Sequence, residues 1–295
     1  MVAWSIKKEE PASIDRACRV TGLSRSLWYY QSRRDDTEVI DKLQELSEKY
    51  SRKGIDTYFK IIRREGIHWG RSRVLRVYRL MKLSFRRKGK KRIPARLRVP
   101  LVPMEGLNTG WSMDFMSDAL ANGRRIRVLN IIDEYSREAL VVHPDYSIPA
   151  STVINQMKIL EEQRGLPSRI RVDNGPEFTS FEFTQWCRSK NIEIIYIQPG
   201  RPMQNAYIER FNKTYRGDIL DAYLFENLEQ VRILSDEWMI IYNNEIPHGS
   251  LNDLTPSEYA KAVISGKPAS RKNLSGFTTI NSHNSSSKKS KLVLS

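Results

Sequence analysis

Three apolar segments with strand-like patterns follow one another in the middle of the chain, and helical and strand-like segments then alternate. This order predicts an α/β fold, with a mixed sheet that carries helices on its faces. The expected strands are Trp111–Phe115, Ile126–Ile132, Ala139–His143, Arg169–Val172 and Ile192–Ile197, and the expected helices are Ser151–Arg164, Ser180–Lys190, Asn205–Arg216 and Leu228–Tyr242.

The N-terminal part of the chain is predicted to be helical. Residues 11–31 predict two short helices around the turn Thr21–Ser24, and Ser24 can cap the second helix, Arg25–Gln31. A DNA-binding helix-turn-helix, with Arg25 on its second helix, and an ordinary helical hairpin fit this segment about equally well.

A second helical group follows. Its expected helices are residues 37–50, Tyr58–Glu65 and Ser72–Lys82. The first carries Val39, Leu43 and Leu46 on one apolar stripe. The last has a basic face on which Arg73 and Arg76 are candidates for contact with phosphates, although a merely solvated face would use the same residues.

The charge balance points to a polyanionic partner. There are 49 Lys and Arg against 34 Asp and Glu, and the formal net charge is +15. Nucleic acid is the leading candidate partner, and a generic basic protein is the alternative. Residues 86–98 contain eight Lys or Arg in thirteen positions and predict a basic linker that either follows a DNA backbone or is a solvated hinge. Its candidate DNA contacts are Arg86, Arg87, Lys90, Lys91 and Arg92.

Cysteine usage and hydropathy exclude several classes of protein. Cys18 and Cys187 are far apart and have no metal-ligand spacing, so neither a disulfide framework nor a zinc site is expected. No apolar run approaches the roughly 18 residues that span a membrane, and the first residues lack a signal-peptide core. We therefore expect a cytoplasmic protein with no membrane role.

Three acidic residues, Asp114, Asp173 and Glu209, lie in distinctive short sequences. Asp114 falls within a predicted strand, Asp173 ends another, and Glu209 lies on a predicted helix. Converging carboxylates can hold Mg²⁺ ions that cut and join phosphodiesters. The 35 residues between Asp173 and Glu209 are weak evidence alone, because roughly three or four acidic pairs in such a chain share any spacing by chance.

The predicted helix around Glu209 has an unusual polar face. Residues three and four positions apart share this face, namely Asn205, Glu209, Asn212, Lys213 and Arg216. One carboxylate, two amides and two cations make a poor core face but suit a metal ligand flanked by groups that hold a DNA backbone. Tyr207, Ile208 and Phe211 are expected to pack on the sheet, and residues 198–204 are expected to form a flap over the site.

Several motifs together carry a family resemblance. They are Trp111-Ser-Met-Asp114, Arg171-Val-Asp-Asn-Gly-Pro-Glu-Phe178, Ile197-Gln-Pro-Gly200, Asn205-Ala-Tyr-Ile-Glu-Arg-Phe-Asn212, Asp221-Ala-Tyr-Leu-Phe225, Tyr242-Asn243 and Pro247-His248. From about residue 11 to residue 262 the chain resembles the DDE transposases of bacterial insertion sequences, whose catalytic core is similar to that of retroviral integrases. More narrowly, it is similar to the OrfB product of elements whose transposase is split between two overlapping reading frames.

The resemblance implies a ribonuclease-H-like core with a five-stranded sheet, in which Asp114, Asp173 and Glu209 bind two Mg²⁺ or Mn²⁺ ions. It implies strand cleavage and strand transfer at the ends of the element, an upstream-frame OrfA partner, and a homo-oligomer on DNA in the bacterial nucleoid. The chain departs from the family at Ile246, where Arg is usual, and at Gly249, where Glu is common.

These features divide the chain into four expected parts: a helical DNA-binding region at 1–84, a basic linker at 85–106, an integrase-like core at 107–264 and a disordered tail at 265–295. Two alternative functions remain open at this point. One is a non-catalytic DNA-binding regulator of the element, and the other is a nuclease for RNA–DNA hybrids on the same fold.

Overall fold

The computed structural model describes residues 13–30, 35–84, 104–198 and 205–266. Three features expected from the sequence lie outside these ranges, namely most of the basic linker, most of the flap and the tail from residue 267. The candidate DNA contacts outside them are Arg86, Arg87, Lys90, Lys91 and Arg92.

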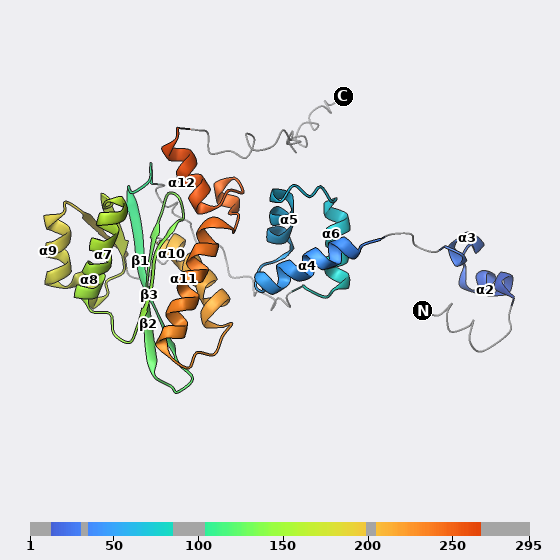
Figure 1. Ribbon diagram of the computed structural model, residues 1–295, viewed down its shortest axis with the longest axis horizontal. Helices are drawn as coiled ribbons and strands as arrows, with labels where there is room; N and C mark the ends of the chain where they lie inside the picture. The colour runs from blue at the N-terminus through green and yellow to red at the C-terminus, as the bar shows by residue number, and fades with distance from the viewer. Residues whose placement is uncertain (1–12, 31–34, 85–103, 199–204, 267–295) are drawn as a thin grey trace, which may run out of the picture.

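A five-stranded sheet forms the centre of the C-terminal part (Figure 1). Its strands are β1 (Gly110–Ala119), β2 (Arg125–Asp133), β3 (Ala139–Asp145), β4 (Arg169–Val172) and β5 (Glu193–Tyr196). Strands β1, β2 and β3 pair antiparallel, whereas β4 pairs parallel with both β1 and β5. The resulting order, β3-β2-β1-β4-β5, confirms the predicted mixed sheet of a ribonuclease-H-like fold.

Helices cover both faces of this sheet (Figure 1). They are α7 (Ala150–Arg164), α8 (Pro176–Thr179) and α9 (Phe181–Ser189) on one face, and α10 (Ala206–Tyr215) and α11 (Leu228–Asn244) on the other. Successive strand residues point to opposite faces. Met113 and Leu129 therefore belong to the core under α7–α9, while Met116 and Val128 belong to the core under α10 and α11.

The main differences from the expectation in the sheet domain concern three elements. Strand β1 continues past Phe115 to Ala119, because cross-strand pairing with β2 holds its polar residues in the strand. A short π-helical segment, η2 (Arg216–Leu220), extends the helix that carries Glu209. Helix α12 (Pro256–Ile264) was not predicted, although Thr255 and Glu258 form a capping box at its start.

The N-terminal pair consists of α2 (Ile14–Thr21) and α3 (Arg25–Trp28). Ser24 caps α3 as predicted, since its hydroxyl accepts a hydrogen bond from the Leu27 N–H at 3.3 Å. The prediction that this second helix reaches Gln31 is wrong, because α3 ends after a single turn. Arg25 forms an exposed ion pair with Asp15.

Helices α4 (Thr37–Lys49), α5 (Ile55–Arg64) and α6 (Arg71–Leu80) form a helical module, residues 35–84, with its own apolar core. Val39, Leu43 and Leu46 are buried in it, as the apolar stripe predicted. Helix α5 begins before the predicted Tyr58, directly after Gly54. None of the described helices is both long and apolar enough to cross a membrane.

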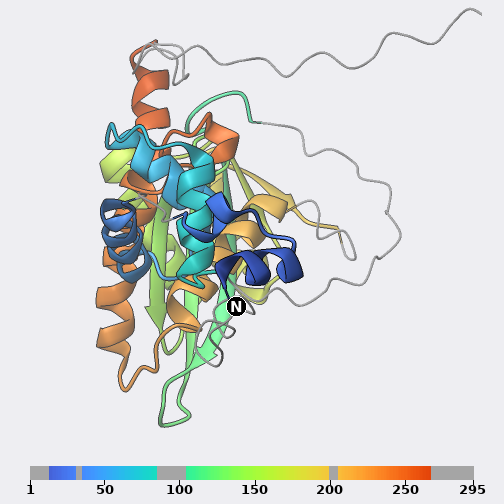
Figure 2. The ribbon, with the colours of Figure 1, turned by 90° about the vertical axis from the view of Figure 1, so that its right-hand side faces the viewer.

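The helical module lies against the C-terminal elements of the sheet domain (Figures 1 and 2). Four ion pairs join them, and in each the module supplies the cation: Lys49–Glu245, Lys53–Asp218, Lys60–Asp253 and Arg64–Glu258. Ile246, where the family usually has Arg, is 8% exposed and packs in the apolar core of the module. The departure from the family at this position therefore adds an apolar contact to the interface.

Candidate active site

Asp114 lies in the middle of β1 and faces helix α10. Its Oδ1 accepts a hydrogen bond from the Phe115 N–H at 2.9 Å, and its Oδ2 accepts one from the Asn212 side-chain amide at 2.7 Å. Burial, together with the nearby carboxylates of Asp173 and Glu209, raises the pKa of Asp114 to about 6, against the lowering effect of the two donors. The charges of Asp173 and Glu209 therefore both act on the carboxyl of Asp114.

Asp173 directly follows β4, the parallel neighbour of β1. Ser112 pairs with Arg171, so two residues further along each chain bring Asp114 and Asp173 to the same level and the same face. The Gly175 N–H donates to Asp173 Oδ1 at 3.0 Å, and the side chain is exposed. A Cβ at position 175 would stand only 3.0 Å from that oxygen, so this turn favours glycine.

Glu209 lies on the exposed side of α10, while Ile208 and Phe211 anchor the helix in the core beneath it. This packing confirms the predicted orientation of both apolar residues. Because α10 crosses the face of β1 that bears Asp114, the helix brings a third carboxylate from a distant part of the sequence to the site.

The three carboxylates do not form a closed metal-ligand set. Among the residues that the structure describes, no three histidine, cysteine or carboxylate side chains are grouped so that they could hold a metal ion. The donor chemistry nevertheless suits a hard divalent cation, because all three side chains offer carboxylate oxygens. A cation would also offset the like-charge repulsion that contributes to the raised pKa of Asp114.

The polar face expected on α10 is divided between core and solvent. Asn205 and Asn212 are 5% and 8% exposed, whereas Glu209 and Lys213 are exposed. Asn212 lies four residues after Ile208, so helical periodicity puts it on the stripe that faces the sheet. It contacts Asp114 there, which corrects the expectation that it contacts a DNA backbone.

Several predicted DNA contacts are engaged in ion pairs within the protein. Arg216 Nη1 lies 3.2 Å from Asp118 Oδ2, and its Nη2 donates to the Ser117 carbonyl. On α6, Arg73 and Arg76 both pair with Asp36. These pairs are only partly buried, so they would cost little to exchange for contacts with phosphate.

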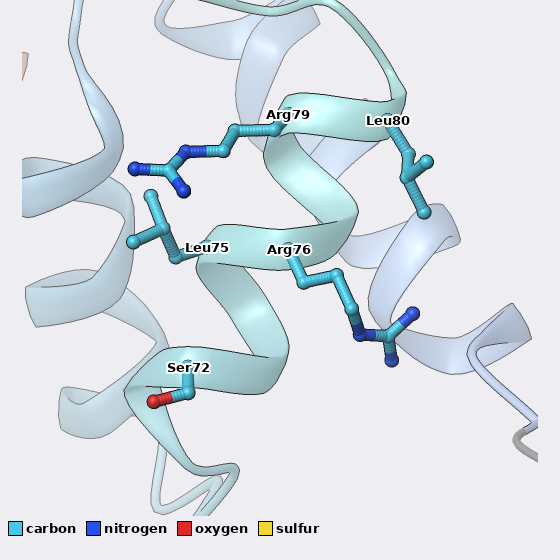
Figure 3. A pocket seen from close by; sticks show the side chains of 5 residues that line it. All are labelled: Ser72, Leu75, Arg76, Arg79 and Leu80. Carbon is cyan, nitrogen blue, oxygen red and sulfur yellow. The ribbon is translucent and has the colours of Figure 1, made fainter.

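The outer face of α6 is open. Ser72, Leu75, Arg76, Arg79 and Leu80 line a shallow hollow along it (Figure 3). Figure 3 shows the guanidinium groups of Arg76 and Arg79 extending to opposite sides of the helix. Arg76 is held by Asp36, whereas Arg79 has no ion pair with any residue in the described ranges.

One polar group near the site was not singled out from the sequence. Asn130, on β2 opposite Asp114, is fully buried and donates to Asn212. The sequence contained a signal for it, since Asn130 interrupts the otherwise apolar run Val128–Ile132. Glu177 pairs with Arg127, whose guanidinium lies 4.2 Å from the centre of the Phe115 ring.

Comparison with known families agrees with this arrangement. Two models of the Integrase core domain match the chain, over residues 105–202 and 190–256. Together these ranges contain the sheet and all three carboxylates. Fold and site thus define a protein with an integrase-like core.

Similar proteins come from bacterial insertion elements. The chain is 37% identical over 258 residues to the uncharacterized 31.7 kDa protein of insertion element IS407 from Burkholderia multivorans. This alignment covers 87% of this chain and 93% of that protein. It is 36% identical over 252 residues to the uncharacterized 39.2 kDa protein of IS476 from Xanthomonas euvesicatoria, covering 85% and 73%. The chain belongs to the family of integrase-like transposases of bacterial insertion sequences.

Solved structures of retroviral integrases show weaker likeness. The HTLV-2 integrase catalytic core domain in complex with magnesium aligns with a TM-score of 0.44 and 19% identity, over 53% of this chain and 98% of that one. The BIV integrase catalytic core aligns with a TM-score of 0.38 and 22% identity, over 54% and 98%.

Proposed function

We propose that this chain cleaves DNA strands at the ends of an insertion sequence and joins them to target DNA, with Asp114, Asp173 and Glu209 as the catalytic carboxylates. One observation carries the proposal: Asp114 on β1, Asp173 directly after the parallel strand β4, and Glu209 on the helix that crosses β1 are near enough for the last two to raise the pKa of the first. Clusters of like charge are costly, and they recur where catalysis or metal binding uses them.

The three carboxylates would hold Mg²⁺ or Mn²⁺, with two ions as the expected number. Bound ions would supply Lewis-acid activation of the attacking hydroxyl and stabilisation of the leaving oxygen in an in-line displacement. The chain itself contributes orientation. The Phe115 N–H and the Asn212 amide each hold one oxygen of Asp114, and the Gly175 N–H holds one of Asp173.

DNA would approach from the solvent side of α10. Lys213 is exposed on the same helix as Glu209, and Arg210 is exposed beside it. Both cations can contact phosphates that flank the cut, without disturbing the buried side of the helix. The helical module and the pair α2 and α3 would supply further DNA contacts, with an OrfA partner and an oligomer on DNA assembling the element ends.

The test is a metal-dependent cleavage assay on duplex DNA that carries the element end. Glu209→Gln should lower the cleavage rate by at least about 10²-fold, the scale on which one charge-stabilising group acts, and leave DNA affinity nearly unchanged. Glu237→Gln, which changes another exposed acid, on α11, is the matched control and should cleave normally.

Unchanged cleavage by Glu209→Gln would remove Glu209 from the mechanism. DNA binding by the wild type with no cleavage in Mg²⁺ or Mn²⁺ would favour the non-catalytic regulator. Preferential cleavage of the RNA strand in a hybrid would favour the hybrid nuclease.

A further inference from the structure

A second amide lies beneath the candidate active site. Asn130 is fully buried in the centre of β2, where it pairs across the sheet with Asp114. Its neighbours on the same face of β2 are Val128 and Ile132, both buried in the apolar core under α10 and α11. An apolar side chain would be the ordinary occupant of such a position.

Asn130 begins a chain of two hydrogen bonds that leads through Asn212 to Asp114. Its amide donates to Asn212 Oδ1 at 2.7 Å, and Asn212 in turn donates from its own amide nitrogen to Asp114 Oδ2 at 2.7 Å. A side-chain amide has an acceptor end and a donor end. Because Asn130 binds the acceptor end of Asn212, the donor end must face the carboxylate.

This arrangement has a cost. Asn130 Oδ1 is buried and has no hydrogen-bond partner in the described structure, and the second donor contact of the Asn130 amide is only to the thioether of Met116, at 3.2 Å. A buried acceptor without a partner destabilises a fold. A residue kept at such a cost points to a role other than packing.

We propose that Asn130 is a positioning residue that fixes the orientation of the Asn212 amide and, through it, the carboxylate of Asp114. Without the Asn130 donor, the Asn212 amide can turn over and present its oxygen to Asp114, where the two acceptors repel. With that donor, each oxygen of Asp114 holds one N–H and keeps its remaining lone pairs in a fixed direction for a cation. This inference rests on the proposed function, because it assumes that Asp114 is a metal ligand.

The test measures Mn²⁺ affinity by electron paramagnetic resonance, on the full chain bound to element-end DNA. Asn130→Val removes the donor and suits a central strand. It should weaken Mn²⁺ binding by roughly 10- to 100-fold, as the loss of a group that orients a metal ligand does, and leave DNA affinity unchanged. Asn130→Ala, which also removes the donor, should weaken binding as much and serves if the valine variant does not fold.

A matched control removes another buried hydrogen bond of α10, from its partner on α11. Ser235→Ala removes the buried hydrogen bond between Ser235 and the Tyr215 hydroxyl, 2.7 Å long, which stabilises α10 but does not lead to Asp114. This variant should bind Mn²⁺ as the wild type does. Equal weakening by Ser235→Ala and Asn130→Val would show a general loss of structure and overturn the positioning role.

The two proposals fail in different ways. Wild-type Mn²⁺ affinity in folded Asn130→Val or Asn130→Ala, with weakened binding in Asp114→Asn, would overturn the role of Asn130 alone. Absence of Mn²⁺ binding by the wild type, or equal binding by Asp114→Asn, would overturn the metal site and the positioning role together.

Discussion

Asp114 should destabilise the fold at neutral pH, and its replacement by asparagine should reveal by how much. Burial and the charges of Asp173 and Glu209 raise the pKa of this carboxyl from its ordinary value of 3.8 to about 6. The folded state therefore disfavours the ionised form, which the unfolded chain adopts freely. Asp114→Asn keeps the shape of the side chain and removes the charge.

The magnitude follows from the two pKa values. Below pH 3.8 the carboxyl is protonated in both states and contributes nothing. The cost of the charge grows as pH rises from 3.8 to about 6 and is complete above that, at about 3 kcal/mol. The variant loses the hydrogen bond from Asn212, because the amide groups of the two asparagines would face each other. This loss lowers the stability of the variant by about 1 kcal/mol at every pH.

Urea unfolding of wild type and Asp114→Asn at pH 4 and pH 7, with divalent cations chelated, isolates the charge. The variant should be about 0.5 kcal/mol less stable at pH 4, where the charge already costs the wild type about 0.5 kcal/mol, and about 2 kcal/mol more stable at pH 7. The constant loss of the hydrogen bond cancels in the comparison between the two pH values. Added Mg²⁺ should then stabilise the wild type more than the variant.

A stability difference between the two proteins that stays the same from pH 4 to pH 7 would refute the reasoning, since it would mean that Asp114 titrates normally. If Mg²⁺ stabilised the variant as much as the wild type, this result would argue separately against Asp114 as a ligand. Protonation of Asp114 would compete with cation binding, so the wild type should need more Mg²⁺ for cleavage as the pH falls below about 6.

Two further predictions concern the interface between the helical module and the sheet domain. Asp218 is 13% exposed and binds both the Lys53 ammonium at 2.6 Å and the Trp238 N–H at 2.9 Å, so Asp218→Ala should cost about 3–5 kcal/mol in urea unfolding. Lys49→Met, which breaks a more exposed pair, should cost at most about 1 kcal/mol, and equal losses would contradict this ranking. Burial, helped by nearby cations, lowers the pKa of His248 from 6.5 to about 4, so its contribution to stability is complete above pH 6.5 and disappears as pH falls towards 4. The wild type should lose about 3 kcal/mol more than His248→Gln over that interval, and parallel pH profiles would show that His248 titrates normally.

Local patterns predicted the elements of the sheet domain well. Strand β4 has the predicted ends, and helix α7 begins only one residue early. In two places where the prediction failed, a long-range contact accompanies the difference. Polar Ser117 and Asp118 remain in β1 only because β2 pairs with them, and η2 extends α10 where Asp218 meets Lys53 and Trp238.

The site was predicted in part. The motifs of the sequence predicted Asp114, Asp173 and Glu209 as site residues, and the charges of the last two contribute to the raised pKa of Asp114. Asn212 was expected to face solvent and DNA, whereas its side chain is buried and contacts Asp114. A helical face is visible in sequence, but whether an amide at its border turns to solvent or to the sheet depends on how the helix packs.

The sequence by itself determined which residue types are available, in what local order, and hence the α/β class, the acidic motifs and the basic character of the chain. Only the tertiary structure decided which side chains meet. Asp114 and Asn130 share a cross-strand pair, and α10 then brings Asn212 onto both of them. The physical reason is that such contacts depend on strand register and helix packing, which act between residues far apart in the chain.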